Sequence, residues 1–122
     1  MILHIDDSAE IRELIHRVLS SYGYHVVHAE DGLNGLNLVS QLKPDLVLLD
    51  LQMPGMSGFD VVKQIKANPE LGQIPVIAFT GSVVPDDHAQ LLAVGFDDFL
   101  AKPPSISDLL KIVRFHDPGG LS

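Results

Sequence analysis

Short runs of apolar residues alternate along this chain with longer segments in which apolar residues recur every three or four positions. Continuous apolar runs are typical of strands that are buried on both faces of a parallel sheet, and the wider spacing is typical of amphipathic helices. The pattern predicts strands over residues 2–5, 24–29, 45–49, 76–79 and 96–100. It predicts helices over residues 11–22, 33–42, 58–65, 85–94 and 106–113. Each predicted strand is therefore followed by a helix.

Residues with strong backbone preferences mark the ends of these helices. Asp7 or Ser8 is expected to cap the first helix, because a short polar side chain can accept a hydrogen bond from a free backbone amide there. Gly23 and Gly95 are expected to stop the first and fourth helices, since glycine adopts the positive φ common at a helix C-terminus. Pro44 is expected to end the second helix.

The regular alternation predicts an α/β protein built as a three-layer αβα sandwich, with helices on both faces of one parallel five-stranded sheet. A chain of 122 residues is long enough for one domain with a single core. We expect residues 1–116 to form that domain. The remaining residues, 117–122, read Asp-Pro-Gly-Gly-Leu-Ser and are expected to be a tail or a linker remnant.

Composition narrows the class of protein. The chain has 16 Asp and Glu against 8 Lys and Arg, and its net charge of −8 opposes direct binding to nucleic acid. It has no cysteine, which is compatible with a reducing cytosol. No apolar run approaches the roughly 20 residues that span a bilayer, and Met1 leads directly into the first strand. We therefore expect a soluble, cytoplasmic protein that does not bind a membrane.

Polar residues follow four of the predicted strands where each strand ends. The pair Asp6 and Asp7 follows the first strand, Asp50 the third, Thr80 the fourth and Lys102 the fifth. The carboxyl ends of parallel strands share one edge of the sheet, so these side chains are expected to form one site. Neighbouring acids repel one another unless a hard cation lies among them. The set suggests a site for a divalent cation and a phosphoryl group.

Taken in order, these elements resemble the receiver domain of the two-component response regulator family, over essentially the whole chain. The matching segments are Asp6-Asp7, Asp50-Leu51-Gln52-Met53-Pro54-Gly55-Met56-Ser57-Gly58, Thr80-Gly81 and Lys102-Pro103. The resemblance implies a flavodoxin-like (βα)5 fold with strand order 2-1-3-4-5. It assigns residues 1–116 to the receiver domain.

The resemblance also implies roles for the acids. Asp50 would accept a phosphoryl group from the phosphohistidine of a sensor histidine kinase or of a histidine phosphotransfer protein. Mg²⁺ would be held by Asp7, Asp50 and the backbone carbonyl of Gln52, with Asp6 acting largely through a bound water. Such a domain catalyses its own phosphorylation and dephosphorylation and is not a turnover enzyme.

Further roles follow for residues on the last two strands. Lys102 would contact a phosphoryl oxygen and would precede a cis peptide bond to Pro103. Thr80 would donate a hydrogen bond to the phosphoryl group, and Phe99 would turn inward as Thr80 moves. The surface of the fourth helix, fifth strand and fifth helix would change with it. That surface would serve a phosphorylation-dependent homodimer or an effector, either fused or separate.

This sequence departs from the usual receiver pattern at several positions. Phe99 occupies a position often held by tyrosine, so the switch would act through packing alone. Pro104 stands where a large apolar residue is usual, and the start of the fifth helix is expected to be displaced. The resemblance further implies that Gln52 and Ser82 would tune the lifetime of the acyl phosphate, because in the family these two positions overlook the path of the hydrolytic water.

Other functions remain as alternatives. A phosphorylation-independent interaction domain on the same scaffold is the strongest of them. A phosphohydrolase of the haloacid dehalogenase type is weaker, because its second acid should stand where this chain has Gln52. A flavodoxin-like FMN carrier and a P-loop NTPase are disfavoured, because this chain lacks the phosphate-binding loop that each of them needs. The six histidines show no metal-ligand spacing, and no role is assigned to them.

Overall fold

The computed structural model describes residues 1–81 and 85–117, with side chains described throughout these ranges except at residues 85–88. Its strands are β1 (Ile2–Ile5), β2 (Val26–Ala29), β3 (Leu46–Asp50), β4 (Val76–Thr80) and β5 (Asp98–Ala101). Its helices are α1 (Ala9–Ser21), α2 (Gly32–Leu42), α3 (Gly58–Ala67), α4 (Pro85–Val94) and α5 (Ile106–His116). Residues 118–122 of the predicted tail lie outside the described residues.

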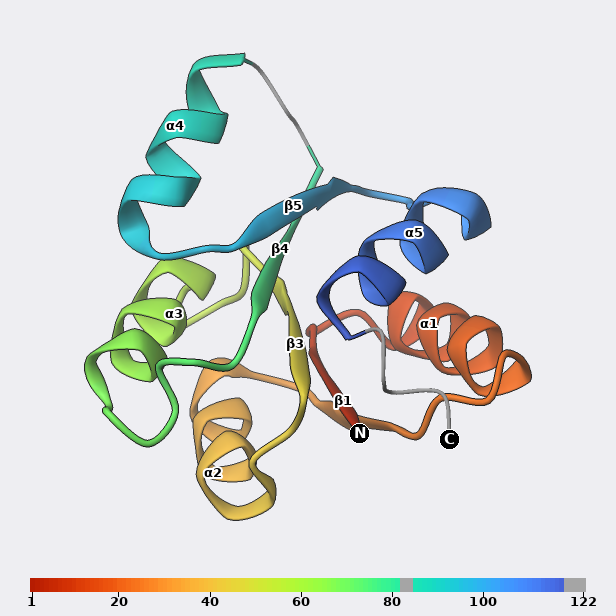
Figure 1. The fold of residues 1–122 in the computed structure, drawn as a ribbon, viewed down its shortest axis with the longest axis horizontal. Helices are drawn as coiled ribbons and strands as arrows, with labels where there is room; N and C mark the ends of the chain where they lie inside the picture. The colour runs from red at the N-terminus through yellow and green to blue at the C-terminus, as the bar shows by residue number, and fades with distance from the viewer. Residues whose placement is uncertain (82–84, 118–122) are drawn as a thin grey trace.

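All strand pairs in the sheet are parallel, and the strand order is β2-β1-β3-β4-β5. Figure 1 shows α1 and α5 on one side of the sheet and α2 and α3 on the other. This arrangement confirms the predicted three-layer α/β sandwich and its strand order. Within the described residues, no helix is long and apolar enough to cross a membrane.

Two apolar clusters hold the layers together, one on each face of the sheet. One cluster joins the sheet to α2, α3 and α4 and includes Val39, Val62 and Leu91. The other joins the sheet to α1 and α5 and includes Leu19 and Leu109. Successive residues of β3 alternate between the clusters, as the two-residue period of a strand requires. Each large side chain that is fully buried in this way contributes about 1.5–3 kcal/mol.

The predicted helix ends agree with the structure where local chemistry decides them. Ser8 caps α1, and its hydroxyl accepts a hydrogen bond of 3.3 Å from the Ile11 amide. Gly23 and Gly95 have φ values of 91° and 126°, and both follow the helices they were expected to stop. The Ser105 hydroxyl caps α5, so the helix begins at Ile106, the first residue of the predicted segment.

Four predicted strands had boundaries that were wrong by one or two residues, and two of them, β4 and β5, end one residue later than predicted, at Thr80 and Ala101. β2 begins at Val26 and not at residue 24, because the Tyr24 amide donates to the Leu19 carbonyl and closes α1. β5 begins at Asp98 and not at residue 96, because the Phe96 amide closes α4 through the Leu91 carbonyl. β3 is displaced by one residue and ends at Asp50 itself.

Candidate functional site

Asp6, Asp7 and Asp50 meet at the carboxyl edge of the sheet, and we call these residues the acid cluster. Asp6 and Asp7 directly follow β1, and Asp50 is the last residue of the neighbouring strand β3. Each offers a carboxylate oxygen, and the three oxygens lie within 4.8 Å of one another. Asp6 and Asp50 are buried, whereas Asp7 is exposed. The edge therefore brings together the three acids that the sequence predicted to meet.

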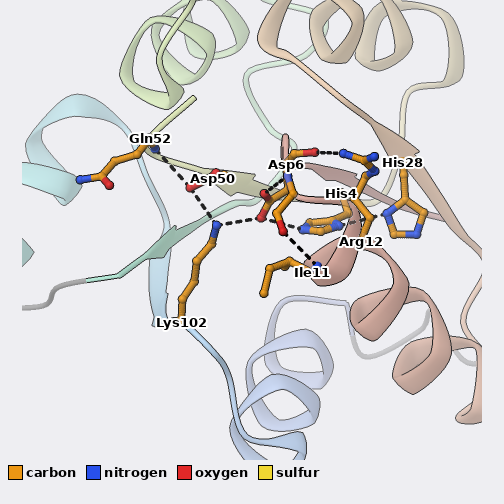
Figure 2. A network of polar contacts seen from close by, with 9 residues as sticks. His4, Asp6, Ile11, Arg12, His28, Asp50, Gln52 and Lys102 are labelled. Atoms are coloured by element: carbon orange, nitrogen blue, oxygen red, sulfur yellow. Dashed lines mark hydrogen bonds and ion pairs between the residues drawn. The ribbon is translucent and has the colours of Figure 1, made fainter. Parts of the chain in front are cut away.

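Lys102 connects the two buried acids. Its Nζ lies 2.9 Å from Asp6 Oδ2 and 3.1 Å from Asp50 Oδ1, as Figure 2 shows. The Lys102 backbone amide donates to the Thr80 carbonyl over 2.9 Å, which places the lysine at the end of β5 beside β4. The peptide bond between Lys102 and Pro103 is cis. One ammonium group thus neutralises much of the charge of two buried carboxylates.

The electrostatic environments of the two buried acids differ. Burial opposes ionisation of Asp6, but the contacts with His4 and Lys102 and the hydrogen bond from the Ser8 amide outweigh it, and the pKa of Asp6 is lowered. Burial raises the pKa of Asp50, helped by the negative charge of Asp6, and the Gln52 amide and Lys102 only partly offset this. Ionisation is therefore more favourable at Asp6 than at Asp50.

Burial also acts on Lys102, where it favours the neutral amine. The hydrogen bonds and charges of Asp6 and Asp50 are stronger, so the pKa of Lys102 is raised above its ordinary value. The ammonium form is therefore held firmly at neutral pH. A fixed positive charge next to Asp50 is suited to stabilising a transferred phosphoryl group.

Backbone contacts hold the carboxylates in place. The Ser8 amide donates to Asp6 Oδ1 over 2.9 Å, and the Gln52 amide donates to Asp50 Oδ1 over 3.2 Å. At the start of α3, a Cβ on Gly58 would collide with the Asp50 carbonyl oxygen and would come within 2.9 Å of the Leu51 Cα. A glycine is therefore required at position 58 for the chain to pass so close to Asp50.

The donor set of the acid cluster fits a magnesium ion. Magnesium prefers hard oxygen ligands and usually binds through one or two carboxylates together with waters. The cluster offers three carboxylates, one of them exposed, and the Gln52 backbone lies two residues after Asp50. The Lys102 ammonium already compensates part of the negative charge. A divalent ion would compensate the remaining negative charge.

The other predicted site residues lie around this edge. Thr80 ends β4 and is 8% exposed, and its register partner on β5 is Ala101, next to Lys102. Phe99 lies on β5 and packs against the apolar cluster shared with α2, α3 and α4. Gln52 is exposed beside Asp50. Ser82 lies outside the described residues.

Sequence reasoning missed two residues that contact Asp6. Arg12 Nη1 donates to the Asp6 backbone carbonyl over 2.7 Å, and His4 Nε2 lies 3.6 Å from Asp6 Oδ2. His4 stands two residues before Asp6, and the two-residue period of a strand was the one signal that could have placed both on one side of β1. Arg12 had no comparable signal, because its contact depends on how α1 packs.

Comparison with known proteins agrees with this geometry. The DNA-binding dual master transcriptional regulator RpaA of Synechocystis is 38% identical over 113 residues, which cover 93% of this chain and 47% of that protein. The phosphate regulon transcriptional regulatory protein PhoB of Pseudomonas aeruginosa is 36% identical over 122 residues, covering 97% of this chain and 53% of that protein. The chain spans about half the length of these relatives.

Solved structures are similar over nearly their whole length. Chemotaxis protein CheY4 of Vibrio cholerae has a TM-score of 0.88 at 31% identity, covering 93% of this chain and 95% of that one. The receiver domain of a histidine kinase from Syntrophus aciditrophicus has a TM-score of 0.87 at 33% identity, covering 97% and 89%. The family model described as response regulator receiver domain matches residues 2–114. The chain therefore belongs to the response regulator receiver domain family, which acts in two-component signalling.

Proposed function

We propose that Asp50 accepts a phosphoryl group from the phosphohistidine of a sensor histidine kinase or of a histidine phosphotransfer protein. The observation that carries the proposal is the Lys102 ammonium, which joins Asp50 to Asp6 at the carboxyl edge of the sheet. Membership of the receiver family supports the same assignment. The chain would act as a signalling domain that promotes its own phosphorylation, without turning over a separate substrate.

The transfer is a nucleophilic displacement at phosphorus. Both the Gln52 amide and the Lys102 ammonium contact Asp50 Oδ1, which favours Oδ2 as the attacking oxygen. As the bond from oxygen to phosphorus forms, the bond from the histidine nitrogen to phosphorus breaks, and the nitrogen keeps the electron pair. The products are an acyl phosphate on Asp50 and a free histidine on the donor protein.

Several residues would prepare this step. Asp7, Asp50 and the Gln52 backbone carbonyl would hold Mg²⁺, with Asp6 acting largely through a bound water. When bound, Mg²⁺ supplies positive charge that offsets the carboxylates and the phosphoryl oxygens. Lys102 would turn from the carboxylates toward a phosphoryl oxygen, and the Thr80 hydroxyl would donate to another.

Phosphorylation would be sensed at the far edge of the sheet. Movement of Thr80 toward the phosphoryl group would release space, and Phe99, already packed against the core, would turn further inward. The change would alter the surface of α4, β5 and α5, which would bind an effector or a second copy of the chain. The two relatives described above are named as transcription regulators and are about twice as long as this chain. The effector would therefore be fused, as extra length of that kind allows, or it would be a separate protein.

The lifetime of the acyl phosphate is a further part of the proposal. Gln52 is exposed and follows the acceptor by two residues, so its side-chain amide would reach the attacking water. Ser82 would be too small to shield that water. Replacing Gln52 with Lys, or Ser82 with a bulkier apolar residue, should slow dephosphorylation and leave phosphorylation intact. Loss of phosphate over time in the isolated chain measures this.

Phosphorylation by a small donor tests the main assignment. The chain is incubated with acetyl phosphate and Mg²⁺, and intact mass is measured before and after treatment with base. We expect one base-labile phosphoryl group per chain, and none in Asp50→Asn or when Mg²⁺ is chelated. Glu30→Gln is the matched control, because Glu30 is an exposed acid that follows β2 at the same edge of the sheet.

Two results would contradict the assignment. A label that survives in Asp50→Asn would place the acceptor elsewhere, and absence of any label in the wild type would favour an interaction domain that does not depend on phosphorylation.

The switch is tested separately with beryllofluoride, an analogue of the phosphoryl group. With Mg²⁺ and intact Asp50, the amide signals of Thr80, Phe99 and Lys102 should shift, and fixed signals would refute the switch even if Asp50 is phosphorylated.

A further inference from the structure

Three histidine side chains form a continuous row that runs from the acid cluster toward the surface. We call His4, His28 and His16 the histidine row. His4 Nδ1 lies 3.0 Å from His28 Nδ1, and His28 Nε2 lies 3.3 Å from His16 Nδ1. The first two are register partners on β1 and β2, and His16 lies on α1. His4 is fully buried and His16 is exposed, so the row links the interior to the solvent.

The carboxylate of Asp6 determines the direction of the hydrogen bonds in the row. The Asp6 carboxylate pairs with Lys102 and accepts from the Ser8 amide, and His4 Nε2 faces its Oδ2 at 3.6 Å, so this nitrogen carries the proton, because a lone pair there would repel the carboxylate. His4 Nδ1 then accepts from His28 Nδ1 (Figure 2). The remaining nitrogen of His28, Nε2, is left with a lone pair that points toward His16.

His28 stays neutral over most of the accessible pH range. Its pKa is lowered to about 4 by burial first and then by the charges of His4, His16 and Arg12. A neutral imidazole nitrogen with a free lone pair is a ligand for Zn²⁺, Cu²⁺ and Ni²⁺, whereas Mg²⁺ prefers oxygen ligands. His28 therefore meets the chemical requirement for a metal ligand without losing a proton.

We propose that His28 Nε2 and His16 Nδ1 bind a divalent transition metal ion such as Zn²⁺. Two nitrogen ligands on a tetrahedral Zn²⁺ at 2.0–2.1 Å are about 3.4 Å apart. The observed separation is 3.3 Å, so the two nitrogens already lie at the required distance, and each ring has only to turn so that its lone pair faces the ion. When the ion binds, the Nδ1 proton of His16 moves through solvent to its Nε2. The proposal goes beyond the phosphoacceptor function and does not depend on it.

The surroundings offer space and a neighbouring acid. An open pocket of about 390 Å³ is lined by Arg12, Glu13, His16, Arg17 and His28. Glu13 precedes His16 by three residues on α1, so both side chains lie on one face of the helix. The Glu13 carboxylate now pairs with Arg17 at 2.6 Å, and both side chains are more than two-thirds exposed. Such exposed pairs are worth about 1 kcal/mol or less, so Glu13 can exchange Arg17 for a metal ion.

An anion is the less suitable occupant of this pocket. The two arginines are already engaged, Arg12 with the Asp6 carbonyl and Arg17 with Glu13. The neutral His28 offers an anion no charge. His4 and Asp6 would instead act as positioning residues behind the metal ligand, since metal-bound histidines commonly donate their other nitrogen to a partner that leads to a carboxylate.

A zinc titration of the full chain tests the proposal. Zn²⁺ is titrated at neutral pH by calorimetry in saturating Mg²⁺, so that the acid cluster is occupied by the ion it prefers. Imidazole nitrogen signals are followed by NMR in the same buffer. We expect one Zn²⁺ per chain, with shifts at His28 Nε2 and His16 Nδ1. His16→Asn and His28→Asn should each lower the affinity by at least about tenfold.

Two matched controls make the result specific. His25→Asn should bind Zn²⁺ like the wild type, because His25 is exposed just before β2 and lies outside the row. Glu13→Gln should weaken binding several-fold, whereas Glu10→Gln, an exposed acid one turn earlier on α1, should not. His16→Asn changes only an exposed side chain, so its effect cannot be ascribed to unfolding.

Three outcomes would overturn the proposal. One is the absence of Zn²⁺ binding in the wild type. Another is unchanged affinity when both His16 and His28 are replaced. The third is stoichiometric displacement of Zn²⁺ by Mg²⁺, which would place the ion in the acid cluster. Equal weakening by Glu13→Gln and Glu10→Gln would show an effect of bulk charge and would remove Glu13 from the ligand set.

Discussion

The acid cluster and the histidine row both meet at Asp6, yet they accommodate buried ionisable groups in opposite ways. In the acid cluster, charge is kept and compensated, because Lys102 contacts both Asp6 and Asp50. In the histidine row, charge is avoided, since burial lowers the pKa of both His4 and His28. A buried ionisable group is tolerated only if it is paired or neutral, and this molecule uses both solutions side by side.

The difference has a functional consequence. A cluster that keeps its charge attracts hard cations, and it accommodates a phosphoryl group only when such a cation offsets the carboxylates, so its response depends on the ions in solution. The two buried rings of the row, His4 and His28, offer lone pairs and ordered hydrogen bonds. The first is suited to phosphoryl transfer and the second to soft or borderline metals. Four predictions sharpen this contrast, and they are given from the largest expected effect to the smallest.

Removing the shared cation should have the largest effect on stability. Lys102→Met leaves Asp6 and Asp50 buried without their positive partner, and we expect a loss of about 3–5 kcal/mol in the free energy of unfolding without Mg²⁺. Urea denaturation in a chelator measures the loss, and adding Mg²⁺ should recover most of it. Lys63→Met, on the exposed face of α3, is the control. Similar losses in both variants would contradict the bridging role of Lys102.

Neutralising the acid cluster should raise stability. A Mg²⁺ concentration of about 100 times the dissociation constant should add roughly 2.7 kcal/mol. The raised pKa of Asp50 means that its ionised form is disfavoured in the folded chain, so Asp50→Asn should raise the melting temperature without Mg²⁺. Thermal scans with and without Mg²⁺ test both statements. Identical scans would count against a metal site among these acids.

The histidine row should give a smaller effect that depends on pH. The pKa of His28 is about 4 in the folded chain and ordinarily 6.5, so between these values the unfolded state binds more protons. This contribution to stability is therefore complete above pH 6.5 and is lost as the pH falls toward about 4. Urea midpoints across this range should fall less steeply in His28→Asn than in the wild type. His25→Asn is the control, and parallel curves for all three chains would refute the prediction.

The exposed ion pair beside the row should matter least. Glu13 and Arg17 are four residues apart on α1 and are both well exposed, and Glu13→Gln should cost about 0.3–0.5 kcal/mol. The cost should disappear in high salt, because solvent ions screen exposed charges. Urea denaturation at two salt concentrations checks this. A loss above about 1 kcal/mol that persists in high salt would mean that the pair is not an ordinary surface ion pair.

Much of the fold could be predicted from the sequence because its determinants are local. Apolar spacing identified every helix and strand, and Ser8, Gly23 and Gly95 marked helix ends through their own backbone chemistry. The strand starts near Tyr24 and Phe96 were misplaced for a different reason. Their amides complete the preceding helices, and an apolar pattern does not show which acceptor an amide will choose.

The sequence by itself also determined where the site lies. Parallel strands end at one edge of the sheet, so residues that follow strands, such as Asp6, Asp50 and Lys102, had to come near one another. Their convergence needed only the order of the elements and the rule that parallel strands run in one direction.

Only the tertiary structure decided which atoms meet. It placed Lys102 between Asp6 and Asp50 and aligned His4 with its register partner His28. It also brought His16 on α1 against His28. These contacts join residues that are between 12 and 96 positions apart in the sequence. They depend on strand register and on the packing of helix against sheet, which are set by the shapes of side chains from the whole core and not by any local pattern.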